Sequence, residues 1–316
     1  MNNRFIFELI LSFQLLSKNT LKAHLALLGA NLIYGINYIV AKGIMPHKLG
    51  ASAFIFIRLV CATTLFWFLK LIFFNEKIDK RDFPRLILCG LLGAATNQLL
   101  FFHGINLTSP IDASIIMTTV PGLVLIFSFL LLKERITNNK LLGIGIGSIG
   151  AILLIVYGNN AGGTSSFLGN LSIFLNALSY SSYLVIVKPL MKKYNAITII
   201  SWVFLFGFLL MLPFGLPDFL NTNFSAFDLD TYLSIGYVVI FTTFFAYLFN
   251  VFALKYVSPS VNSSYIYLQP AINFILVSIY AFILNQTQYQ QDIDAIKVLS
   301  CLLVVLGVYL ISKHSK

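Results

Sequence analysis

Charged residues are scarce in this chain. Asp, Glu, Lys and Arg together make up 10% of the 316 residues, whereas hydrophobic residues make up 58%. A soluble protein of this length needs much more polar surface, so the composition excludes an ordinary globular domain. The sequence therefore predicts an integral membrane protein.

Cysteine and histidine are also rare. The three cysteines, Cys61, Cys89 and Cys301, lie in apolar stretches, and their spacing fits neither a disulfide nor a metal site. The four histidines are scattered along the chain, and no pair of acidic residues accompanies them. We therefore expect no metal, no bound cofactor and no catalytic residues.

Long apolar stretches recur along the chain, and each approaches the length needed to cross about 30 Å of hydrocarbon as a helix. They predict an all-α integral membrane fold with ten transmembrane helices. The predicted spans are residues 24–45, 51–74, 84–104, 111–132, 141–158, 168–187, 198–217, 229–254, 260–284 and 296–312.

The hydrophobic pattern of the first half of the chain is repeated in the second half. Thr108-Ser109-Pro110 begins one apolar stretch that contains Pro121, and Val257-Ser258-Pro259 begins another that contains Pro270, at a constant offset of 149. Tyr34, Lys42 and Met45 recur in the same way as Tyr180, Lys188 and Met191, at an offset of 146. Because five crossings is an odd number, the second copy of such a repeat enters the membrane upside down, which is typical of alternating-access transporters. The predicted units are an N-terminal arm (1–22), a first five-helix repeat (23–158) and a second, inverted repeat (159–316).

The net charge of +10 is unevenly distributed. Most Lys and Arg residues fall in the connections on one side of the predicted spans, which follows the positive-inside rule. We therefore place both termini in the cytoplasm, in a multi-pass protein of the cell (inner) membrane. The basic charge is explained by topology, so a nucleic-acid partner is not expected.

Polar side chains within the predicted spans follow helical spacing. Asn31, Tyr34, Tyr38 and Lys42 share one face of the first span. Similar stripes lie on the sixth, eighth and ninth spans. Polar residues in lipid are costly unless they face protein or a watery cavity. One interpretation is interhelical hydrogen bonding, but packing seams prefer small residues. We favour a central cavity, because tyrosines and amides recur in both halves. The predicted substrate-binding residues are Tyr34, Tyr38, Tyr180, Tyr183, Tyr247, Asn250, Tyr265, Gln269 and Asn273.

Four further residues attract attention within the spans. Pro121 and Pro270 each remove a helical hydrogen bond at matching positions, so we interpret them as a pair of hinges. Arg58 is either an anion anchor, a structural tie or a side chain that reaches the membrane surface. His103 is a candidate proton relay or a polar residue at a helix end. No carboxylate falls at the middle of a span, so the sequence does not indicate a coupling ion.

Glycines at 145, 147 and 150 match the dinucleotide fingerprint Gly-x-Gly-x-x-Gly. That fingerprint requires a preceding strand, whereas these glycines lie inside an apolar span. We interpret Gly143 and Gly147 instead as a site of close helix contact.

Taken together, these features resemble the EamA family of the drug/metabolite transporter superfamily, over about residues 22–312. The resemblance is carried by the segment from Phe102 to Thr137, by its counterpart from Ala253 to Leu284 and by Arg58 in FIFIRLV. The family's Gly-Glu after the fourth helix is replaced by Lys133-Glu134, and the second copy has no acidic residue there. The resemblance implies transport of small metabolites or drugs without a cofactor. It also implies a site between the first, third, fourth, sixth, eighth and ninth helices.

The sequence therefore predicts a secondary transporter that exports small metabolites such as amino acids or drugs. Its expected partners are a small-molecule substrate, the lipid bilayer and, as a candidate, a second copy of the chain. Two alternatives stay open at this point: a membrane-embedded enzyme that acts on lipid-soluble substrates, and a scaffold or sensor that transports nothing.

Overall fold

The computed structural model describes residues 3–45, 48–133, 138–157, 165–257, 259–280 and 295–312. Within these ranges, all regular secondary structure is helical. Apolar chains in lipid favour helices because each helix satisfies its own backbone hydrogen bonds. The α-helices are α1 (Asn3–Ile44), α2 (Ala51–Phe73), α3 (Phe83–Gly90), α4 (Thr96–Asn106), α5 (Pro110–Met117), α6 (Val120–Leu132), α7 (Asn138–Tyr157), α8 (Phe167–Met191), α9 (Ala196–Leu220), α10 (Leu229–Tyr237), α11 (Ala246–Tyr256), α12 (Pro259–Ser264), α13 (Leu268–Ser278) and α14 (Ala295–Ser312).

Seven helical segments of the described chain are long and apolar enough to cross a membrane. They agree with the first four and the sixth to eighth predicted spans. They are Asn19–Ile44, Ala51–Phe73, Lys80–Asn106, Pro110–Leu132, Phe167–Met191, Ala196–Leu220 and Leu229–Tyr256.

The other three predicted spans are less complete. The fifth and tenth correspond to α7 and α14, whose apolar stretches, Leu141–Gly150 and Ala295–Gly307, are shorter. The ninth is divided into α12, a 3₁₀ turn and α13, and residues 281–284 of that predicted span lie outside the described residues. The all-helical membrane fold is confirmed, whereas the count of ten crossings stays a prediction.

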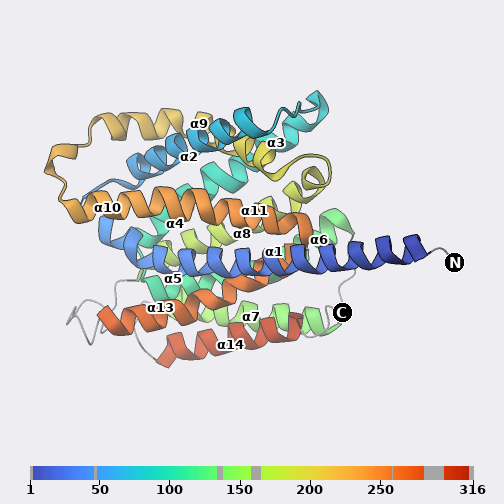
Figure 1. The fold of residues 1–316 in the computed structure, drawn as a ribbon. Coiled ribbons are helices and arrows are strands. Elements are labelled where there is room, and N and C mark those ends of the chain that lie inside the picture. Colours follow the sequence, from blue (N-terminus) through green and yellow to red (C-terminus); the bar gives the residue numbers. More distant parts are fainter. Residues whose placement is uncertain are drawn as a thin grey trace.

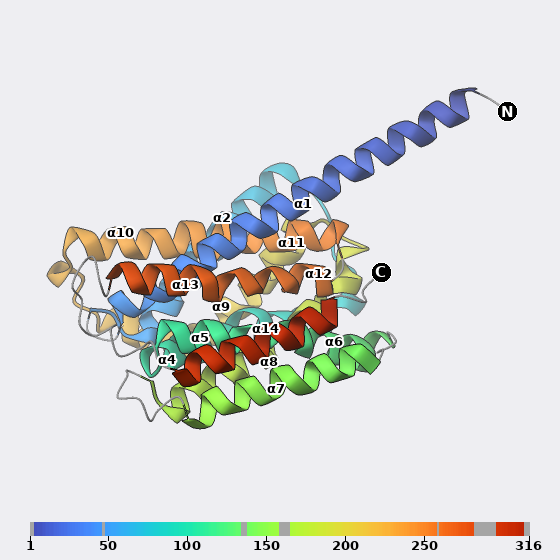
Figure 2. The same ribbon diagram turned by 90° about the horizontal axis from the view of Figure 1, so that it is seen from below.

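The helices lie side by side in one bundle, and the N-terminal part of α1 projects beyond it (Figures 1 and 2). With 42 residues, α1 is roughly 63 Å long at 1.5 Å per residue, about twice the hydrocarbon thickness. The predicted arm and the first predicted span are thus one continuous helix. The start of α1 and the end of α14 lie at the same end of the bundle (Figure 2).

Helix contacts occur in matching sets. The helices α2 and α9 pack against each other, and so do α7 and α14. The helix α1 packs on α11, just as α8 packs on α4. Close approach of α7 and α14 depends on glycine: a Cβ on Gly307 would lie 2.5 Å from the carbonyl oxygen of Gly143 and 2.6 Å from the backbone nitrogen of Gly147. The interpretation of Gly143 and Gly147 as a helix contact is confirmed.

Several helices are interrupted inside the bundle. A π-helical segment, Leu91–Ala95, separates α3 from α4, and a second, Val238–Phe245, separates α10 from α11. The fourth predicted span breaks at Thr118 and Thr119, between α5 and α6, and the ninth breaks at the 3₁₀ turn Tyr265–Tyr267. Both interruptions are thus repeated at corresponding places of the two halves.

The two prolines lie just after these breaks rather than in mid-helix. Pro121 occupies the first turn of α6, and Pro270 the first turn of α13, where a missing N–H is well tolerated. The carbonyls of Ile115 and Ile116 before the first break are not free, because the hydroxyls of Thr118 and Thr119 donate to them.

Candidate functional site: a buried polar cavity

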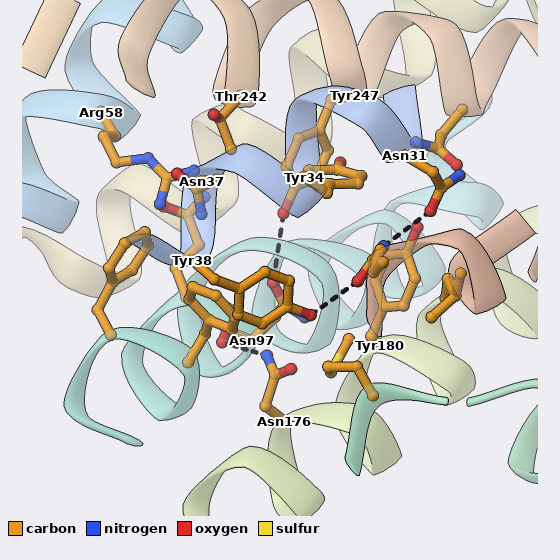
Figure 3. A pocket seen from close by; sticks show the side chains of 17 residues that line it. Asn31, Tyr34, Asn37, Tyr38, Arg58, Asn97, Asn176, Tyr180, Thr242 and Tyr247 are labelled. Atoms are coloured by element: carbon orange, nitrogen blue, oxygen red, sulfur yellow. Dashed lines mark hydrogen bonds between the residues drawn. The ribbon is translucent and has the colours of Figure 1, made fainter. Parts of the chain in front are cut away.

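A cavity with an empty volume of about 600 Å³ lies within the bundle (Figure 3). Side chains from both halves of the chain line it. They are Asn31, Tyr34, Asn37, Tyr38, Arg58, Asn97, Gln98, Phe101, Phe102, Met117, Asn176, Tyr180, Thr242, Tyr247, Asn250, Ile266 and Gln269.

Most of the predicted substrate-binding residues belong to this lining. Helical spacing on α1 brings Tyr34 and Tyr38 to the cavity together with Asn31, as the stripe predicts. The other predicted residues found in the lining are Tyr180, Tyr247, Asn250 and Gln269.

Three predicted residues lie elsewhere. Tyr183 is buried beside Tyr180 and against Gly93, where a Cβ would lie 2.5 Å from the tyrosine ring. Asn273 is buried one turn beyond Gln269 and donates to its backbone carbonyl. Tyr265 is partly exposed, and its hydroxyl lies 2.7 Å from Nδ1 of His24. None of the three lines the cavity, so their assignment to its wall is corrected.

A hydrogen-bonded chain crosses the cavity wall from α1 to α13. The Tyr38 hydroxyl donates to Oε1 of Gln269 at 2.7 Å, and Nε2 of Gln269 donates to Oδ1 of Asn31 at 2.7 Å (Figure 3). On the opposite wall, Asn176 donates to the backbone carbonyl of Asn97. The Tyr247 hydroxyl lies 3.3 Å from Oδ1 of Asn97. These bonds orient the amides and hydroxyls that a bound solute would contact.

Arg58 lies in the cavity wall and is 2% exposed, so it does not reach the membrane surface. Its Nε donates to Oγ1 of Thr243 at 2.7 Å, and its guanidinium carbon lies 4.3 Å from the centre of the Phe102 ring. Nη1 is buried and has no hydrogen-bond partner. His103, by contrast, is exposed on α4 and does not line the cavity.

The sequence prediction missed Asn97 and Gln98, which both line the cavity although they are adjacent in the chain. The π-helical segment before them changes the helical phase, so a regular α-helical period cannot place them. Thr242 was missed for the same reason, because it lies inside the second π-helical segment. Asn37 was also missed, because it lies next to Tyr38 and off the α1 stripe.

One end of the bundle, away from the start of α1, holds a buried polar cluster. Thr108 donates to Asn170, and Asn170 donates to Asp112 at 3.4 Å. Nζ of Lys297 lies 3.0 Å from Oδ1 of Asp112, at ion-pair distance but without the alignment of a hydrogen bond. All four side chains, Thr108, Asp112, Asn170 and Lys297, are fully buried. We call them the far-end cluster.

Two lysines hold corresponding helix ends. Lys42 on α1 donates to the carbonyls of Ile105, in the last turn of α4, and of Thr108, just after that helix. Lys188 on α8 donates to the carbonyls of Leu254 and Val257, at the end of α11. Carbonyls at a helix end need such partners, and a cation there also favours the helix dipole.

Two ion pairs join the halves reciprocally. Lys48 pairs with Asp228 at 3.0 Å, and Lys193 pairs with Asp82 at 3.0 Å. The pKa of Asp228 is lowered to about 2, chiefly because its carboxylate accepts from the Thr231 side chain and then from Lys48. A carboxylate with a lowered pKa stabilises the fold above its unfolded pKa of about 3.9. That contribution is lost as the pH falls through about 2.

Among the described residues, no group of three or more His, Cys, Asp or Glu side chains could hold a metal ion. The described cavity wall instead offers one cation, several carboxamides and several phenols. Such a surface suits reversible binding of a small amphiphilic solute.

Comparison with known proteins agrees with a membrane transporter. The chain is 27% identical to the uncharacterized transporter YetK of Bacillus subtilis over 238 residues, which are 73% of this chain and 71% of YetK. YyaM, another uncharacterized transporter of B. subtilis, is 24% identical over 91% of this chain and 92% of its own length. The WAT1-related protein At2g40900 of Arabidopsis thaliana is 25% identical over 89% of this chain and 76% of its own.

A solved crystal structure of a protein shares the fold, with a TM-score of 0.62 and 18% sequence identity over 94% of this chain and 97% of that chain. The sequence model of the EamA-like transporter family matches residues 21–156 and, a second time, residues 167–313. The chain is thus a multi-pass membrane protein and belongs to the EamA-like transporter family.

Proposed function

We propose that this protein is a secondary transporter that exports small metabolites, such as amino acids or drugs, across the cell membrane by alternating access. The observation that carries the proposal is the cavity inside the bundle, which polar and aromatic side chains from both halves of the chain line. A site between two halves is what a carrier needs, because their relative movement can open it to either side in turn.

Several observations support ten crossings in two inverted repeats. The family model matches the chain twice in succession. The breaks in the third and eighth predicted spans are both π-helical. The contacts of Lys42 and Lys188 are equivalent: the lysines differ by 146 in position, and their carbonyl partners by 149. These are also the offsets at which the sequence repeats.

The two ends of the bundle are closed to different degrees. This is expected of an alternating-access carrier, whose site is open to only one side of the membrane at a time. The far-end cluster is fully buried. At the other end, His24 is the counterpart of Asn170 at the offset of 146. Its hydrogen bond to Tyr265 joins two partly exposed residues. In addition, α5 packs on both α1 and α8, whereas α12 packs chiefly on α6. We infer that the cavity opens toward the end where α1 begins.

The membrane orientation rests on charge and on the fold. Both the start of α1 and the end of α14 lie at one end of the bundle (Figure 2), and most Lys and Arg residues belong to connections at that end. Apolar side chains such as Leu71, Leu130 and Phe214 are exposed on the bundle surface, where lipid would cover them. We place both termini in the cytoplasm and the protein in the cell (inner) membrane.

The function is tested with the purified full-length protein. A metabolite panel is first screened for solutes that raise the melting temperature, because a ligand that binds only the folded state stabilises it. Each stabilising solute is then followed across proteoliposome membranes, with and without a pH gradient. Exchange of labelled for unlabelled solute is the expected result.

The matched control is Met117→Trp, which is intended to fill the cavity from α5. It should abolish exchange without preventing folding. If no stabilising solute crosses the membrane in either direction, the protein is not a carrier for them. Chemical conversion of a solute would indicate an enzyme instead.

A further inference from the structure

The cavity carries a single formal charge that nothing in its described lining compensates. Arg58 is the one charged side chain among the 17 lining residues. The ion pairs among the described residues join Lys48 to Asp228, Lys193 to Asp82 and Lys297 to Asp112, and none of them involves Arg58. A charge withdrawn from water is costly unless an opposite charge or several hydrogen bonds accompany it.

The contacts that Arg58 does make leave part of its guanidinium unused. Thr243 accepts from Nε, and Phe102 lies against the guanidinium at 4.3 Å. These two contacts hold the planar group in place, yet Nη1 remains buried without a hydrogen-bond partner. Oδ1 of Asn37, another residue of the cavity lining, is likewise buried without one. The guanidinium is therefore held in one orientation, but its hydrogen-bond donors are not all used.

We propose that Arg58 binds the carboxylate of the transported solute, and that the substrates are small monocarboxylates with an apolar body. This inference rests on the proposed transport function. A carboxylate matches the fork of a guanidinium and accepts two hydrogen bonds from it. One cation balances one negative charge, which favours a monoanion over a phosphate ester.

The rest of the cavity agrees with this substrate class. No carboxylate belongs to the described lining, so a positively charged solute would meet Arg58 without a compensating anion from these residues. Phe101, Phe102 and Tyr180 offer apolar surface for the body of the solute. A substrate's ammonium group, as in an amino acid, has no ionic partner there and is not required for binding.

The test compares small apolar ligands that carry different head groups: a carboxylate, a neutral amide, an ammonium group or a phosphate ester. The melting temperature of the purified full-length protein is measured with hydrocinnamate, with its neutral amide, with phenethylammonium and with phenyl phosphate, and then with isocaproate and its amide. We expect the carboxylates to stabilise the protein and the corresponding amides and the ammonium compound to bind at least about tenfold more weakly.

Two variants distinguish a role of Arg58 in binding the carboxylate from a purely structural role. Arg58→Gln should weaken carboxylate binding by roughly ten- to a hundredfold and abolish the preference over the amide. The control Thr243→Val removes the hydrogen bond from Nε but keeps the charge, so it should keep that preference. Should Arg58→Gln fail to fold, Arg58→Lys retains the charge without the fork and should bind carboxylates more weakly while still preferring them to amides.

The proposal is overturned if the amide, the ammonium compound or the phosphate ester stabilises as well as the carboxylate, or if Arg58→Gln keeps the preference. It is equally overturned if no carboxylate raises the melting temperature at millimolar concentration. Failure of the transport function looks different: carboxylates would then bind through Arg58 but would not cross proteoliposome membranes. If a neutral solute crosses the membranes and carboxylates do not, the transport function is supported and the proposal of carboxylate substrates is refuted.

Discussion

Uncharged side chains supply most of the polar groups in the cavity lining, and several of them hydrogen-bond to one another. Gln269 illustrates this, because it accepts from Tyr38 and donates to Asn31. Because its oxygen accepts from one residue and its nitrogen donates to another, this amide is fixed in one orientation. A single residue of α13 therefore organises two residues of α1.

We predict that Gln269→Leu reduces transport roughly tenfold, because it leaves the Tyr38 hydroxyl and the Asn31 amide buried without their partner. Asn273→Leu is the matched control: Asn273 lies one turn further along α13, outside the cavity, and should give a smaller loss. The measurement is initial exchange rate in proteoliposomes at equal protein content. Equal losses in both variants would remove Gln269 from the site.

The site could be predicted wherever the α-helical period holds. The stripe on α1 predicted that Asn31, Tyr34 and Tyr38 share one face, and all three line the cavity because that helix is continuous. On the ninth predicted span the same spacing misplaced Tyr265, because the 3₁₀ turn there rotates it toward His24. No signal within one helix could have indicated the contact of Arg58 with Thr243, since it joins two distant segments.

At the scale of helices, the interruptions decide what the cavity contains. The π-helical segments and the broken fourth and ninth predicted spans turn polar residues inward that a straight helix would have placed elsewhere. A helix that ends inside a membrane protein leaves carbonyls without partners, so its ends need donors. Lys42 and Lys188 provide these donors at corresponding ends of α4 and α11.

We predict that Lys42→Met and Lys188→Met each destabilise the protein by about 1–3 kcal/mol, because each leaves two carbonyls without a charged donor. The two sites lie at opposite ends of the bundle, so the double variant should show the sum of the single effects. Unfolding in detergent, followed by circular dichroism, measures this. The exposed Lys22 provides the control, and Lys22→Met should have no effect. A negligible effect at Lys188 alone would show that the two contacts are not equivalent.

For the buried ion pair between Asp112 on α5 and Lys297 on α14, we expect larger losses of stability from single substitutions. Asp112→Asn or Lys297→Met should each cost about 3–5 kcal/mol of stability, because the remaining charge stays buried without its counter-charge. The double variant should recover much of that loss, since neither charge then remains. The same unfolding assay gives the coupling energy. Additive losses in the double variant would mean that the two charges do not stabilise each other.

For the whole molecule, composition and periodicity predicted a helical membrane bundle, and the fold confirms it. Long apolar stretches such as Pro110–Leu132 leave few other structures possible in lipid. Contacts between the halves could not be predicted in this way. The far-end cluster joins Asp112 near the start of the fourth predicted span to Lys297 near the start of the tenth, and only the packed bundle brings them together.

If the halves move against each other, the far-end cluster must open during each cycle. We predict that a cross-link between Thr108→Cys and Asn170→Cys, which joins the halves, stops transport, and that reduction restores it. The experiment uses a protein whose three native cysteines are replaced, and a short reducible bifunctional thiol reagent. A cross-link between Thr108→Cys and Lys42→Cys lies within the first half and should leave transport nearly unchanged relative to the reduced protein. Full activity with Thr108 and Asn170 linked would show that the far end stays closed, and would exclude alternating access through it.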